Sequence, residues 1–176
     1  MVSTTTPGTS RELLALVDAG WRSFRDAVRG LGRGRMTEPT PVGWTYRDLL
    51  AHVAAWEDLT ARRLRTFRES GRQTLAEEAR DTDAFNARVV EAHRLVGPEA
   101  LLDELDTAHR RLAREIQHLT DEQVAADVRD TPWGPASWVV AIVAGNTYGH
   151  YAEHRQELDV TPSGRQDLQE RGLDGW

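Results

Sequence analysis

Apolar side chains recur every three to four residues at the start of the chain, which is the period of an amphipathic helix. Ser10 or Thr9 can cap this first helix, and a run of glycines ends it. A second helix begins where Thr45 and Asp48 form a variant of the capping box, and it stops near Gly71. The pattern therefore predicts two long helices in the first part of the chain.

Residues 72–97 form a long connection that contains one shorter helix. After it, apolar side chains again recur every three to four residues. Pro98 opens a third long helix, because proline suits the first turn. Residues 120–135 are expected to form a loop. Ser137 or a neighbour then caps a last long helix that continues without a break to Leu158. Strand signals are almost absent.

These elements predict an all-α protein, a four-helix bundle with an extra short helix in the connection. A chain of 176 residues is long enough for one domain with a substantial core. We expect residues 10–160 to form the bundle, residues 1–9 a disordered tail, and residues 161–176 a polar C-terminal tail.

Composition narrows the possible functions. All 22 basic residues are arginine, which excludes a Schiff-base or P-loop lysine, and cysteine is absent, which excludes disulfides and thiolate metal sites. A net charge of −6 argues against nonspecific binding to nucleic acid or anionic membranes. No apolar run is long enough to span a bilayer, and no secretory signal is recognisable. We therefore expect a cytoplasmic protein.

In the last helix the inward apolar face becomes polar without changing direction. At about 100° per residue, Val139, Val143, Asn146, His150 and His154 fall within an arc of roughly 80°. Two imidazoles on such a face are either a hydrogen-bonded core feature or a pair of metal ligands. The spacing alone leaves both interpretations open.

A metal site needs a third ligand at the same height on another helix, and His52 is the candidate. His52 lies about 10 Å into its helix, and His150 and His154 lie about 13 and 8 Å from the end of theirs. The three rings meet if these helices are antiparallel and miss by roughly 9 to 15 Å if they are parallel. The metal hypothesis therefore requires residues 72–97 to cross over, so that the second and third long helices are parallel.

The other three histidines carry no such signal. His118 lies opposite the apolar stripe of its helix and should be exposed. His93 and His109 flank their stripes and are expected at the boundary between core and solvent. We predict that neither His93 nor His118 is a metal ligand.

Two segments, GWTYRDLLAHVAAWED and NTYGHYAEHRQEL, resemble the DinB/YfiT-like metalloenzyme superfamily. With DAFNARVV, they are similar to its branch near the maleylpyruvate isomerase N-terminal domain and ClbS/DfsB-type bundles. The resemblance implies an up-down-down-up bundle, often dimeric, with a divalent metal held by His52, His150 and His154. It also implies thiol-dependent transfer or isomerisation for several members. Some members on the ClbS/DfsB side lack the three histidines and work without metal.

Three neutral imidazoles leave an open coordination position, as in catalytic zinc sites. Zinc is the first expectation, and nickel, iron and manganese stay open. The leading hypothesis is a metal-dependent enzyme in which a low-molecular-weight thiol, such as mycothiol or bacillithiol, attacks a small electrophilic molecule. Asn146 is the candidate catalytic residue that orients the substrate, or else a polar core residue. Glu157 is a candidate hydrogen-bond partner for an imidazole N–H.

Two other functions stay open. One is a hydrolase or self-protection protein of the ClbS type, in which a metal-bound water attacks. The other is a non-catalytic bundle that binds a small molecule or only a structural metal. The expected partners are a small-molecule substrate and possibly a second copy of the chain, with no nucleic acid and no membrane.

Overall fold

The computed structural model of the protein describes residues 6–41, 43–74, 80–131 and 134–158. Of the two predicted tails, residues 1–9 and 161–176, only residues 6–9 belong to this part of the chain. The elements are α1 (Ser10–Leu31), the 3-10 turn η1 (Arg33–Arg35), α2 (Tyr46–Ser70), α3 (Thr82–His93), α4 (Pro98–Gln117), α5 (Asp121–Ala125), β1 (Arg129–Thr131), β2 (Gly134–Ala136), α6 (Trp138–Asn146) and α7 (Tyr148–Leu158).

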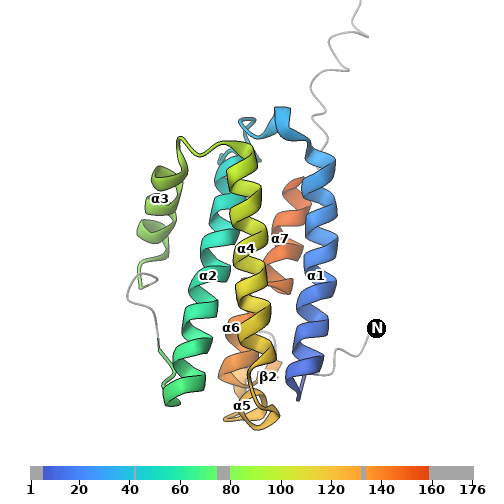
Figure 1. Cartoon of the computed structure of the whole chain (residues 1–176), viewed down its shortest axis with the longest axis vertical. Coiled ribbons are helices and arrows are strands. Elements are labelled where there is room, and N and C mark those ends of the chain that lie inside the picture. The colour runs from blue at the N-terminus through green and yellow to red at the C-terminus, as the bar shows by residue number, and fades with distance from the viewer. Residues whose placement is uncertain (1–5, 42, 75–79, 132–133, 159–176) are drawn as a thin grey trace, which may run out of the picture.

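The long helices form an up-down-down-up bundle, which confirms the predicted fold class. In Figure 1, α1 runs upward, α2 and α4 both run downward, and α6 with α7 returns upward. The segment between α2 and α4 crosses back along the outside of the bundle and carries α3, which packs against α2. The helix with His52 is therefore antiparallel to the helix with His150 and His154, as the metal hypothesis requires. In the described residues no helix combines the length and apolarity needed to cross a bilayer.

The predicted caps explain where the helices begin and end. Thr9 accepts a hydrogen bond from the backbone N–H of Glu12, and Thr45 does the same with Asp48, each pair forming a capping box. Gly71 ends α2 in the left-handed region at φ 69°, which a glycine adopts without strain. These local signals determine where α2 begins and ends, and therefore the position of His52 along the bundle axis.

The core has two parts, one at each end of the bundle. The end that holds the histidines contains Phe24, Leu49, Leu101 and Tyr151 among its fully buried side chains. The other end is mainly aliphatic and contains Leu13, Leu64, Leu112, Ile116 and Val143. Burial of this apolar surface is the main contribution to stability of the fold.

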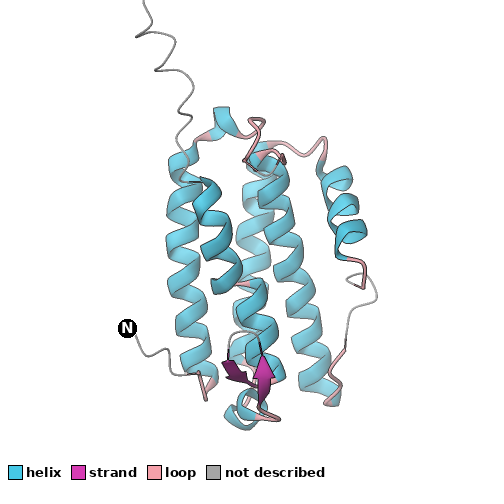
Figure 2. Ribbon diagram, turned by 180° about the vertical axis from the view of Figure 1, so that it is seen from behind, coloured by secondary structure: helices cyan, strands magenta, loops and turns pink. Residues whose placement is uncertain are grey.

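Residues 120–135 are not simply a loop, which corrects the sequence prediction. Thr120 and Gln123 form a further capping box that starts α5, and β1 pairs with β2 in an antiparallel hairpin. Figure 2 shows this hairpin at the end of the bundle beside α6. The elements are so short that neither helical nor alternating periodicity could reveal them.

The last helix is broken, although the sequence predicted one continuous helix. Thr147, at φ −133° and ψ −107°, separates α6 from α7. The side chains of Asn146 and Thr147 donate to the carbonyls of Ile142 and Val143, at 2.7 and 2.6 Å, and so compete with the backbone ladder. The chain then passes so close to itself that a Cβ on Gly149 would lie 2.8 Å from the carbonyl oxygen of Ala144.

Candidate metal centre

His52, His150 and His154 meet between α2 and α7. The Nε2 atom of His150 lies 2.8 Å from Nε2 of His52 and 2.9 Å from Nε2 of His154. The potential ligand atoms of the three residues all lie within 4.8 Å of one another. His52 is only 6 % exposed. Two helices thus bring three ring nitrogens to one point in a largely buried position.

The role of each nitrogen in His52 follows from its neighbours. The indole N–H of Trp56 can only donate, and it donates to Oδ1 of Asn86 at 3.1 Å. The same oxygen lies 3.0 Å from Nδ1 of His52, so Nδ1 must carry a hydrogen and donate it. Nε2 of the neutral ring is therefore left with a free lone pair, directed at His150.

His154 is oriented in the same way by an acidic neighbour one turn along α7. Its Nδ1 lies 2.9 Å from Oε1 of Glu157, so that nitrogen carries the hydrogen. In the neutral form of this ring, Nε2 presents a lone pair to His150 as well. The hydrogen bond supports the prediction that Glu157 orients an imidazole. Glu153, the other acidic residue of this turn, is exposed.

Their surroundings hold His52 and His150 in the neutral form. Burial and the nearby His154 lower the pKa of His52 to about 4. Burial lowers the pKa of His150 to about 2, with further contributions from His154 and His52. At neutral pH, His52 therefore directs a lone pair at a second neutral imidazole, that of His150. The donor set fits a divalent cation such as zinc, whose histidine ligands are neutral and commonly hydrogen-bonded at the other ring nitrogen, as His52 and His154 are.

Aromatic side chains surround His52. Trp44 packs edge-on against its ring with centroids 4.9 Å apart, and Trp56 packs at 6.2 Å. Trp56 in turn contacts Phe85 of α3 at 4.9 Å. The crossover segment therefore contributes both an apolar side chain and the Asn86 amide to this side of the site.

The remaining histidines lie elsewhere. Nδ1 of His93 contacts the Val89 carbonyl at 2.7 Å, its Nε2 lies 3.0 Å from Glu104, and His118 is exposed as predicted. His109 is buried, at 7 % exposure, which corrects the prediction of a boundary position. The His109 ring hydrogen-bonds Glu57 inside the bundle, a polar partner that helical periodicity alone did not reveal.

Asn146 ends α6, and its side-chain amide donates to the Ile142 carbonyl at 2.7 Å. Among the described residues no hydrogen bond joins that side chain to the three imidazoles. The break at Thr147 also changes the angular relation that a straight helix would have given Asn146 and His150. The substrate-orienting role of Asn146 stays a prediction.

Asn86 is a hydrogen-bonding partner at the site that the sequence gave no reason to select. It lies on α3, 34 residues from His52, next to the buried Phe85. The only signal was its place in the DAFNARVV segment, which carried resemblance without a role. Contact between the crossover helix and α2 is what places it beside His52.

The chain was compared with known protein families and curated proteins. Residues 17–157 match the sequence model of a family described as the mycothiol maleylpyruvate isomerase N-terminal domain. No curated protein matches the chain at a significant level.

Several solved structures share the fold. The colibactin self-resistance protein ClbS, solved in complex with a dsDNA, aligns with a TM-score of 0.72 at 13 % identity, covering 88 % of this chain and 96 % of ClbS. An uncharacterised protein from Escherichia coli UTI89 aligns at 0.69 and 16 % identity, covering 89 % and 94 %. The mycothiol-dependent maleylpyruvate isomerase aligns at 0.66 and 17 % identity, covering 86 % of this chain and 61 % of the isomerase. At these identities the likeness establishes the bundle architecture.

Proposed function

The chain belongs to the mycothiol maleylpyruvate isomerase N-terminal domain family, and from this premise we propose that it is a divalent-metal-dependent enzyme that activates a low-molecular-weight thiol. The substrate is a small electrophilic molecule, and the reaction is S-transfer or isomerisation. Zinc is the preferred metal, and nickel, iron and manganese are the other candidates.

The observation that carries the proposal is the convergence of three Nε2 atoms, two of which belong to rings whose Nδ1 is already hydrogen-bonded. Asn86 and Glu157 hold the Nδ1 hydrogens of His52 and His154. An arrangement with lone pairs facing one another is unfavourable in a buried site unless a cation or proton lies between them. Because the pKa values of His52 and His150 are low, a cation suits the site better than a proton.

Each residue around the site would have a separate role in binding the cation or activating the thiol. His52, His150 and His154 would hold the cation, and Asn86 and Glu157 would keep their rings in the ligating tautomer. A bound divalent cation lowers the pKa of a thiol, which makes it nucleophilic near neutral pH. Trp44 and Trp56 would shield one side of the site from water, so that the electrostatic attraction between the thiolate and the cation would be weakly screened.

The family membership favours thiol chemistry, whereas ClbS supports a second candidate function. The ClbS structure is covered almost completely by this chain, and ClbS is a self-resistance protein. In this alternative the protein hydrolyses or sequesters a reactive small molecule without a thiol. Since the ClbS structure contains dsDNA, the absence of a nucleic-acid partner stays a prediction for this chain. A cytoplasmic location and a homodimer likewise stay predictions.

A thiol-dependence assay separates these functions. Zinc-reconstituted protein is incubated with maleylpyruvate or a simple electrophile, with and without mycothiol, and product is followed by absorbance and mass spectrometry. The proposal predicts turnover only when thiol and metal are both present, and none with His52→Ala. Turnover without thiol would support the hydrolase. Stoichiometric metal without turnover of any electrophile would support a binding protein.

A further inference from the structure

Metal binding at the proposed site would depend on the spacing of α2 and α7, yet α7 is not a straight continuation of α6. The helix breaks at Thr147, whose backbone leaves the helical region. His150 and His154 both follow this break, so α6 alone does not fix their position. Other contacts must hold α7 at the correct distance from His52.

A buried polar cluster makes such a contact. Glu57 of α2 is 0 % exposed, and its Oε1 accepts hydrogen bonds from the hydroxyl of Tyr151 on α7 and from Nδ1 of His109 on α4, the latter at 3.1 Å. Its Oε2 is buried and has no hydrogen-bond partner. Burial raises the pKa of Glu57, and the bonds from His109 and Tyr151 offset part of that cost. An acidic group in this position is expensive, which argues for a specific role.

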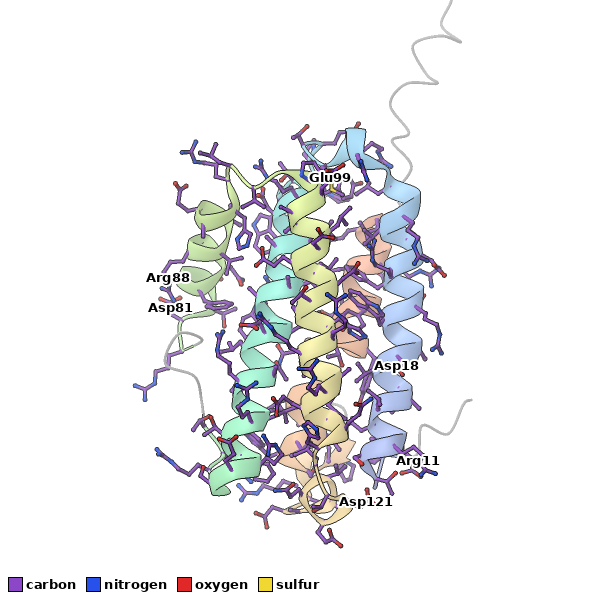
Figure 3. The ribbon with its side chains drawn as sticks, viewed as in Figure 1. Arg11, Asp18, Asp81, Arg88, Glu99 and Asp121 are labelled. Carbon is purple, nitrogen blue, oxygen red and sulfur yellow. The ribbon has the colours of Figure 1, made fainter. Side chains whose placement is uncertain are left out.

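The first helix completes the cluster. The ring of Trp21 stacks on His109 with centroids 4.0 Å apart and planes within 5°. Asp18, labelled on α1 in Figure 3, lies 4.0 Å from Nε2 of His109. The ring of Tyr151 packs against Phe24 of α1 at 5.3 Å. Helices α1, α2, α4 and α7 thus all contribute to holding the Tyr151 hydroxyl in place.

The cluster lies directly beside the metal centre along both helices. Tyr151 follows His150 in sequence, and Glu57 is about a turn and a half beyond His52. On the opposite side of the histidines, the hydroxyl of Tyr46 at the start of α2 donates to the backbone carbonyl of Glu157 on α7 at 3.3 Å. The three histidines therefore lie between two hydrogen bonds that join α2 to α7.

We propose that Tyr151, Glu57 and His109 are positioning residues that set the distance between His52 and the two histidines of α7, and thereby the metal affinity. This inference rests on the proposed metal site. The hydroxyl of Tyr151 acts through the position of α7 and does not contact the metal. Loss of the bond between Tyr151 and Glu57 should let α7 shift on the break at Thr147, with the aromatic ring still buried.

The experiment compares Tyr151→Phe with a control that loses stability elsewhere. Ile116→Val removes one buried methylene from α4 in the other core cluster, away from the histidines. Zinc affinity is measured by competition with a chromophoric chelator, and the visible spectrum of the Co²⁺-loaded proteins reports ligand geometry. We expect Tyr151→Phe to weaken zinc binding about tenfold or more and to change the Co²⁺ spectrum. Ile116→Val should retain the wild-type affinity and spectrum.

A second pair of variants keeps the test decisive if Tyr151→Phe fails to fold. Glu57→Met removes the acceptor and should weaken zinc binding, whereas Glu57→Gln keeps an acceptor oxygen and should restore most of the affinity. Wild-type affinity and spectrum in Tyr151→Phe or Glu57→Met would overturn the positioning role and leave the metal site intact. Failure of the wild type itself to bind zinc, nickel or manganese would overturn both proposals.

Discussion

Mild acid should destabilise the metal-free protein, because His52 is buried in its neutral form. Its pKa is lowered from 6.5 to about 4 by burial and by the neighbouring His154. Below pH 6.5 the unfolded chain binds a proton at this imidazole, whereas the folded protein binds it only near pH 4. The unfolded state then binds more protons, so the free energy of unfolding falls as the pH drops through this window.

The loss in the free energy of unfolding can be worked out from the difference between the pH and the pKa of the unfolded imidazole. At pH 5 the unfolded imidazole is about 1.5 pH units below its pKa, and each unit corresponds to about 1.36 kcal/mol. His52 therefore costs about 2 kcal/mol of stability at pH 5. His150, whose pKa is lowered to about 2, costs a similar amount at the same pH. The sum, about 4 kcal/mol, is a large part of the total stability of an ordinary domain.

Urea unfolding in the presence of a chelator measures this effect at pH 7 and pH 5. The variant His52→Gln should lose about 2 kcal/mol less than the wild type between these two pH values. His118→Gln, at an exposed position, should lose as much as the wild type. An equal loss in His52→Gln and the wild type would show that the folded protein does not hold His52 neutral, and would refute the reasoning.

Three further predictions concern packing and the site. Gly20→Ala should lower the free energy of unfolding, measured by thermal or urea denaturation, by about 1–3 kcal/mol, because the new Cβ would lie 2.9 Å from Cβ of Tyr148. Gly30→Ala is the control and should be neutral or stabilising, because no atom lies within 4 Å of its new Cβ. Asn86→Ala should weaken zinc binding about 10- to 100-fold in calorimetric titrations, and unchanged affinity would exclude its orienting role. His93→Gln should leave the metal content found by elemental analysis unchanged, and a loss would mean that the ligand set is wrong.

Most of the fold could be predicted because its signals are local. Capping residues such as Thr45 and Ser137 and the helix stop at Gly71 act within a few residues of themselves. The topology followed from a longer argument, since three histidines on two helices meet only if the helices are antiparallel. The structure confirms that arrangement of α2 and α7.

The features that sequence reasoning missed depend on contacts between distant segments. Asn86 reaches His52 only because the crossover helix packs against α2, and His109 is buried only because Glu57 accepts its hydrogen bond. The break at Thr147 had a local signal in the Asn-Thr pair and Gly149, but the apparent continuity of one helical face from Val139 to His154 outweighed it. Polar partners inside a bundle are not visible in the spacing of apolar residues.

Zinc titration of chelator-treated protein tests the central claim most directly. The wild type should bind one zinc ion per chain, and at a free zinc concentration of about 100 times the dissociation constant it should gain about 2.7 kcal/mol of stability. His52→Ala, which removes the only ligand from α2, should lose both the bound zinc and the zinc-dependent stabilisation. Wild-type protein that takes up no stoichiometric zinc, nickel or manganese would contradict the account, as would full zinc binding by His52→Ala.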